Sequence, residues 1–157
     1  MALGVKRVVL WRIDVENQPG VLARTLEPLA AAGADLRLVM GYRFPKTPEH
    51  SAVEVFPVSG RRATAAAQQA GLVPSDIPCL LVEGDDRPGL GSVLARTLAD
   101  AGINIAFVMA VSSGRRFTAA FGFDDDAFEA AEKASFFEDH VIGQLNALDA
   151  ERFRRHR

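Results

Sequence analysis

DRPGLG at positions 86–91 opens an apolar, alanine-rich run that ends with GINI at 102–105. The same pattern occurs earlier as NQPGVL at 17–22, where the run ends with GADL at 33–36. The two Pro-Gly pairs stand 69 residues apart, and so do the two glycines that end the runs. A repeat of fixed spacing indicates two copies of one supersecondary unit.

The hydrophobic pattern around the first copy predicts the order βαββαβ, which is that of the ferredoxin-like unit. Alternating or β-branched runs predict the strands, and apolar residues three or four apart predict the helices. The predicted strands of copy one are 7–15, 36–44, 51–56 and a short 72–74, with a loop at 45–49 and helices from Pro19 to Gly33 and over 61–70.

The second copy repeats this order until its last element. Its predicted strands are 78–83, 103–111 and 116–123, and its predicted helices are 89–101 and 127–137. His140–Ile142 could form a fourth strand, but the apolar residues from Val141 onward also fit a helical stripe. We favour a helix through to the C-terminus, which leaves copy two without its fourth strand.

The fold class predicted from these elements is α+β, with two ferredoxin-like units whose antiparallel sheets can join side by side, and a C-terminal helix. The expected boundaries are 6–75 for the first unit, 76–142 for the second and 143–157 for a helical basic tail. A missing fourth strand would leave a sheet edge for a second chain to pair with or for the C-terminal helix to cover, and we expect a homodimer.

Composition excludes several classes of protein. The 157 residues are 48% hydrophobic, which is enough for a buried core, and the net charge of −2 gives no basic footprint for nucleic acid or anionic membrane. Cys79 is the single cysteine, and His50, His140 and His156 lack the spacing of metal ligands. No apolar run reaches the roughly 20 residues of a membrane span, and the start lacks a secretory pattern. We therefore expect a cytoplasmic protein without cofactor or metal.

The repeated pattern resembles the ACT domain: a strand, Asp or Asn before x-Pro-Gly, a helix, a glycine, and Asn-Ile leading into a strand. Copy two matches this pattern closely and copy one with substitutions, and together they cover roughly Arg7 to Ile142. The chain resembles small stand-alone tandem ACT proteins, which have no attached catalytic domain. The resemblance implies a non-catalytic regulatory protein that binds an amino acid at an interface between ACT units.

The turn before each helix suits an amino acid chemically. A helix start supplies unpaired N–H groups for a carboxylate, and glycine allows a ligand to approach the backbone. Asp86 or Asn17 can accept from an ammonium group, and Asn104 or Asp35 can add a second polar contact. The candidate ligand-binding residues are Asp86, Arg87, Pro88, Gly89, Leu90, Asn104 and Ile105 in copy two, and Asn17, Gly20, Val21, Asp35 and Leu36 in copy one.

The two copies exchange their acid and amide. If the loop of each copy faces the strand of the other, Asp86 meets Asp35 and Asn17 meets Asn104. The two sites would then differ, and we expect only one of them to be occupied. Plain helix capping also explains Asp, Asn, Pro and Gly at these turns, so a purely structural role stands as the alternative.

A second function class is a protein-interaction or RNA-binding module, because the same topology carries RNA-recognition sheets. That function needs exposed aromatic residues beside basic ones, for which Tyr42, Phe44, Phe107 and Phe117 are available. The usual sequence signature of such sheets is absent. An enzyme is the weakest alternative, because no motif places a pair of titratable groups together.

Overall fold

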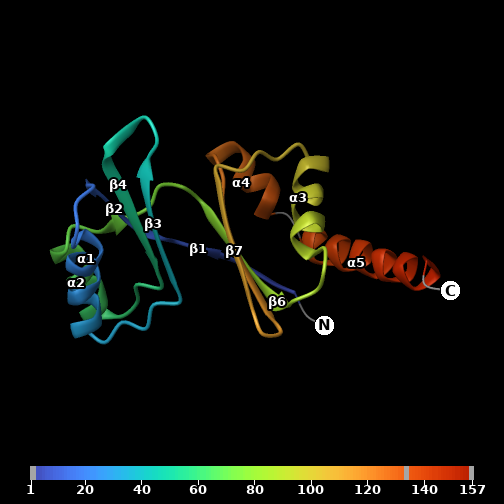
Figure 1. Cartoon of the computed structure of the whole chain (residues 1–157), viewed down its shortest axis with the longest axis horizontal. Coiled ribbons are helices and arrows are strands. Elements are labelled where there is room, and N and C mark those ends of the chain that lie inside the picture. The colour runs from blue at the N-terminus through green and yellow to red at the C-terminus, as the bar shows by residue number, and fades with distance from the viewer. Residues whose placement is uncertain (1–2, 133–134, 156–157) are drawn as a thin grey trace. The chain divides into compact units, whose positions relative to one another are not determined.

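The computed structural model describes residues 3–132 and 135–155, and the chain divides into two compact units (Figure 1). We call Val9–Asp76 the inserted unit, because it interrupts the other one. The flanking unit consists of Met1–Val8 together with Ile77–Arg157.

The inserted unit has the complete ferredoxin-like order. Its elements are β2 (Trp11–Glu16), α1 (Val21–Ala31), β3 (Leu38–Phe44), β4 (Thr47–Phe56), α2 (Arg61–Gln69) and β5 (Val73–Pro74). The strands form one antiparallel sheet in the order β3-β4-β2-β5. The residues buried between this sheet and the helices are Leu29, Val53, Val55, Ala67 and Leu72.

The flanking unit repeats this arrangement with a different fourth strand. Its elements are β1 (Gly4–Val8), β6 (Cys79–Asp85), α3 (Leu90–Asp100), β7 (Phe107–Ser113), β8 (Arg116–Gly122), α4 (Asp125–Glu132) and α5 (Ser135–Arg155). The sheet order is β1-β6-β8-β7, and all its pairs are antiparallel. The predicted α+β class with two ferredoxin-like units is confirmed.

The prediction of one strand over 7–15 is wrong. The run breaks at Val9–Leu10, and its halves β1 and β2 belong to different sheets. β1 pairs with β6, with Val8 opposite Cys79, and so takes the place of the fourth strand that copy two lacks. Residues 6–8 therefore belong to the flanking unit, and the sheet edge expected to be open beside β6 is filled from within the chain.

The C-terminal helix is confirmed. α5 packs against α3, and Val141 and Leu145 are buried in the same core as Leu90 and Leu94. The predicted tail 143–157 thus begins inside α5, and at least its Leu145 belongs to the core. Among the described residues, no helix combines the length and apolar character needed to cross a membrane.

Candidate ligand site

The loop that leads into α1 is held by backbone geometry and by its neighbour strand. Gly20 precedes α1 with φ of +87°, a conformation that other residues adopt only with strain. The Asn17 N–H donates to the carbonyl of Glu49 (2.7 Å), and its side-chain amide N–H donates to the carbonyl of Pro48 (3.0 Å). The loop is therefore fixed to the start of β4, and the amide oxygen of Asn17 is left as an acceptor.

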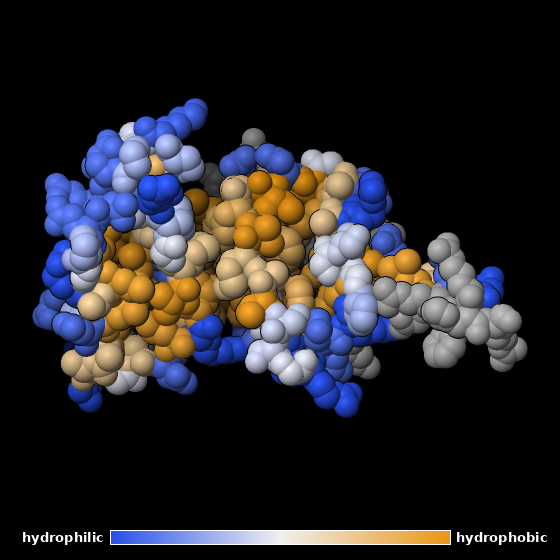
Figure 2. Space-filling model, viewed as in Figure 1, coloured by the Kyte–Doolittle hydropathy of each residue, from blue (hydrophilic) through white to orange (hydrophobic). Residues whose placement is uncertain are grey.

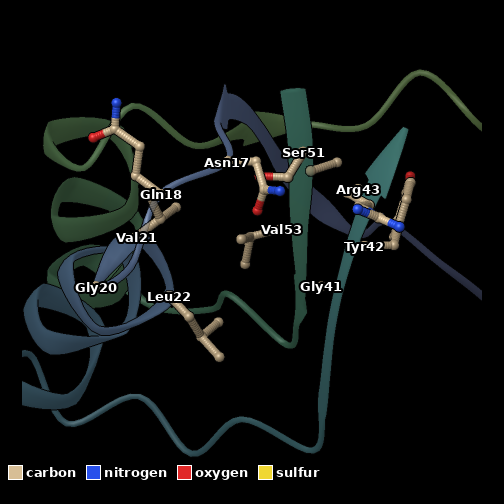
Figure 3. A pocket seen from close by; sticks show the side chains of 11 residues that line it. Asn17, Gln18, Gly20, Val21, Leu22, Gly41, Tyr42, Arg43, Ser51 and Val53 are labelled. Atoms are coloured by element: carbon tan, nitrogen blue, oxygen red, sulfur yellow. The ribbon is translucent and has the colours of Figure 1, made fainter. Parts of the chain in front are cut away.

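A cavity of about 380 Å³ lies beside this loop, between the start of α1 and strands β3 and β4 (Figure 3). Its floor is formed by three buried residues, Ser51, Ala52 and Val53. In Figure 3, Leu22 and Val53 reach into the space from α1 and β4, and the amide oxygen of Asn17 points into it. The lining residues are Asn17, Gln18, Gly20, Val21, Leu22, Gly41, Tyr42, Arg43, Ser51, Ala52 and Val53.

Two residues give the cavity its shape and apolar rim. Gly41 has no side chain, and a Cβ built there would meet nothing within 4 Å. Leu22, at the start of α1, is 46% exposed. Val39, which lies on the edge strand β3 together with Gly41, is 43% exposed. Figure 2 shows apolar residues gathering between α1 and β3 on the visible face of the inserted unit.

The charges at this site are positive. Arg43 lines the cavity, and the Arg24 guanidinium lies 3.4 Å from the position that a Cβ on Gly20 would take. The helix start adds N–H donors: Val21 donates to the Gln18 carbonyl at 3.3 Å, which leaves the amides of Leu22 and Ala23 as donors that the helix itself does not use. None of the lining residues is acidic. The surroundings therefore favour a carboxylate over a cation.

Of the five residues predicted in copy one, Asn17, Gly20 and Val21 line the cavity. Asp35 and Leu36 lie past the other end of α1, an 11-residue helix about 16 Å long. Asp35 is exposed, and Leu36 is partly buried against the core. The loop before α1 and the residues that follow α1 lie at opposite ends of the helix. They can therefore contact one ligand only if the loop of one unit meets the corresponding residues of another unit.

The loop before α3 is engaged by its own neighbours. Asp86 accepts a hydrogen bond from the Ser112 hydroxyl (2.8 Å), and Arg87 donates to the side-chain oxygen of Asn146 in α5 (3.5 Å). Gly89 precedes α3 with φ of +93°, Pro88 is exposed, and Leu90 is buried in the core. Beyond the far end of α3, Asn104 is exposed and Ile105 packs partly against that core.

Strand pairing identifies which residues correspond in the two units. Ser51 lies opposite Val15 and Arg43, and Phe117 lies opposite Gly84 and Ser112. Both partners of Ser51 are 69 residues before the partners of Phe117, so Ser51 and Phe117 hold the same place. Phe117 is 5% exposed and belongs to the apolar core of the flanking unit.

A polar cluster on β2, β3 and β4 is a feature that the sequence did not predict. Glu54 is fully buried; it accepts from the Tyr42 hydroxyl at 2.8 Å, and an Arg12 guanidinium nitrogen lies 3.5 Å away. Burial raises the pKa of Tyr42 to about 12, and the hydrogen bond to Glu54 and the negative charge of Glu54 act in the same direction. A hydrogen bond to Asp14 (2.8 Å) raises the pKa of Arg12 against the effect of burial. The second oxygen of Glu54 has no hydrogen-bond partner among the described residues.

No group of three or more potential metal ligands occurs among the described residues. A second hollow, of about 450 Å³, lies along β2 and β5 and includes Arg12, Asp14 and Asp76 in its lining.

Comparison of the whole chain with solved structures identifies the fold. A protein from Bacteroides thetaiotaomicron superposes with a TM-score of 0.65 at 16% identity, over 83% of this chain and 90% of that one. The regulatory subunit of aspartate kinase from Thermus thermophilus gives 0.57 at 19% identity, over 92% and 97%. The chain has the ACT-type fold. Aspartate kinase from Clostridium acetobutylicum also matches, with a TM-score of 0.54 at 14% identity, over 92% of this chain and 34% of the enzyme.

The sequence itself matches no family model and no curated protein. The resemblance read from the repeated loop is thus confirmed through the fold.

Proposed function

We propose that the chain is a non-catalytic regulatory protein that binds an amino acid in the cavity beside α1. The observation that carries this proposal is the cavity itself, which opens at one of the two loops where the ACT resemblance places a ligand. Its volume of about 380 Å³ falls within the range of small-molecule sites, roughly 300–1,000 Å³.

The polar groups around the cavity match the two ends of an amino acid. Arg43 and the amides at the start of α1 suit the carboxylate, since guanidinium and helix N–H groups both bind carboxylates well. The free amide oxygen of Asn17 suits the ammonium group. The similar Thermus thermophilus protein is a regulatory subunit, and its structure is described as a ligand-free form.

The RNA-binding alternative fits the sheets poorly. Phe117 is buried in the core, and the Tyr42 hydroxyl is bound to Glu54. Phe117 is therefore not available to stack on bases. A protein-interaction role remains compatible with the proposal, because a regulatory subunit must reach a partner.

Calorimetric titration of the full chain with the twenty common amino acids tests this function. At least one should bind, and Arg43→Met should weaken it roughly 10- to 150-fold, the effect expected for one charged hydrogen bond. Arg62→Met is the matched control, since Arg62 is exposed and does not line the cavity. Silence across the panel would contradict the proposal.

We also propose a homodimer, in which loops and strand entries of different units can meet. In this dimer we still expect Asp86 to face Asp35 and Asn17 to face Asn104. Light scattering at micromolar concentration checks the mass, and a monomer would contradict the dimer.

A further inference from the structure

Ser51 and Phe117 hold corresponding places in the two units, but their side chains differ greatly in size. Both side chains lie on the helix-covered face of their sheets, because they alternate in step with Val53 and Ala119, which belong to the two cores. In the flanking unit the phenyl ring is buried in the core that includes Leu90 and Leu94. In the inserted unit a hydroxymethyl group holds this place, and a cavity lies beside it.

The rest of the cavity floor suits an apolar group. Val53 is buried, with an exposed fraction of 4%, and Val21 and Leu22 line the α1 side. Gly41 leaves the opposite wall without a side chain. Ser51 donates weakly to the Val15 carbonyl at 3.5 Å, so its hydroxyl is directed to the backbone of its own sheet.

The charged groups that line or adjoin the cavity disfavour a cationic side chain. Arg43 lines the cavity and Arg24 lies against Gly20, whereas no lining residue carries a negative charge. A lysine or arginine side chain would bring a third positive charge close to Arg43 and Arg24, which repel it.

We propose that the cavity selects an amino acid with an apolar side chain up to the size of a phenyl ring, which takes the place that Phe117 fills in the flanking unit. This inference rests on the proposed function, because it names the ligand class of the same site. Position 51 then determines the specificity: a small residue admits the ligand side chain and a large one replaces it.

The test titrates the full chain with L-phenylalanine, L-leucine, glycine and L-lysine. Phenylalanine or leucine should bind roughly 10- to 100-fold more tightly than glycine, as burial of one such side chain provides. Lysine should bind more weakly than either. Tightest binding of glycine or lysine would overturn the inference and leave the proposed function standing, whereas no binding by any of the twenty common amino acids would remove both.

Ser51→Phe supplies the ring from the protein and should abolish binding, with an unchanged circular dichroism spectrum and no loss of thermal stability. Ser51→Ala keeps the space and is the matched control, which should bind as the unmodified chain does. Gly41→Val narrows the same cavity from β3 and serves as the second blocking variant should Ser51→Phe fail to fold. Unchanged affinity in a folded blocking variant would overturn the inference.

Discussion

Glu54 shows how one residue of the inserted unit depends on its neighbours. Its carboxylate is fully buried, and the Tyr42 hydroxyl and the Arg12 guanidinium approach the same oxygen, Oε1. A buried charge is tolerated only when it is hydrogen-bonded or paired. Tyr42 therefore stabilises the sheet through a charged hydrogen bond.

Tyr42→Phe removes this donor and should lower the free energy of unfolding by about 1.5–3 kcal/mol, as measured by urea denaturation. In a Glu54→Gln background the acceptor is neutral, so the same change should cost only about 0.5–1.5 kcal/mol. Equal costs in both backgrounds would show that the charge on Glu54 does not strengthen the bond.

The ionisation of Tyr42 gives a direct readout, because it is the single tyrosine of the chain. Its pKa is raised to about 12, above the value of about 10 in an unfolded chain. The stability that Tyr42 contributes is therefore fully present below pH about 10 and is lost as the pH rises through about 12. Ultraviolet titration of the phenolate should give these two values without and with urea, and a midpoint near 10 in the folded protein would contradict the burial.

Only part of the cavity lining could be predicted from the sequence. Asn17, Gly20 and Val21 follow from the repeated turn, because helix starts have a local sequence pattern. Ser51 does not, because the pairing of β3 with β4 shifts register between Arg43 and Phe44, which adds three residues between the paired positions Arg43 and Ser51 compared with Ser112 and Phe117. A constant offset of 69 therefore compares Ser51 with Ala120, and only strand pairing aligns it with Phe117.

Substitution of alanine for two glycines of the flanking unit should change its stability in opposite directions. A Cβ on Gly122 in β8 would overlap the ring of Phe107 in the neighbouring strand β7, whereas a Cβ on Gly143 in α5 would meet nothing within 4 Å. Gly122→Ala should destabilise the flanking unit by about 1–3 kcal/mol through overpacking. Gly143→Ala should stabilise it by roughly 0.5–1 kcal/mol, because alanine favours the helix.

Thermal and urea unfolding measure both changes, and each variant serves as the control for the other. A smaller ring, as in the double variant Gly122→Ala with Phe107→Leu, should recover part of the loss. A neutral Gly122→Ala would mean that β7 shifts to accommodate the methyl group at little cost.

The helices were predictable because their signals are local. Gly20 and Gly89 before the helices, and Gly33 and Gly102 after them, all have positive φ, which explains why the glycines recur at one spacing. The partner of a strand is not a local property. The run 7–15 is β-branched and then alternates, and nothing in its residues shows that Val8 pairs 71 positions ahead with Cys79 while Trp11 pairs with Val55.

On the scale of the whole molecule, the chain is one unit inserted into another. Since Val8 lies opposite Cys79, a two-residue Asn-Gly turn can join them as a hairpin and remove everything between. This shortened flanking unit should unfold cooperatively on heating, although it loses the hydrogen bond from the Phe123 N–H to the Pro78 carbonyl.

The matched control lacks residues 1–8 as well. It should be clearly less stable, because Leu3 is buried in the core of the flanking unit and Val5 packs against it. Equal melting temperatures for the two pieces would contradict the assignment of β1 to this unit.

The insertion also sets an order of events while the chain is being made. β1 emerges first, but Asp76, the last residue of the inserted unit, is complete before β6 exists to pair with β1. The inserted unit can therefore fold first, with β1 waiting as an unpaired strand. Lys6 and Arg7 lie on that strand, and charged side chains on an unpaired strand disfavour its pairing with strands of other chains.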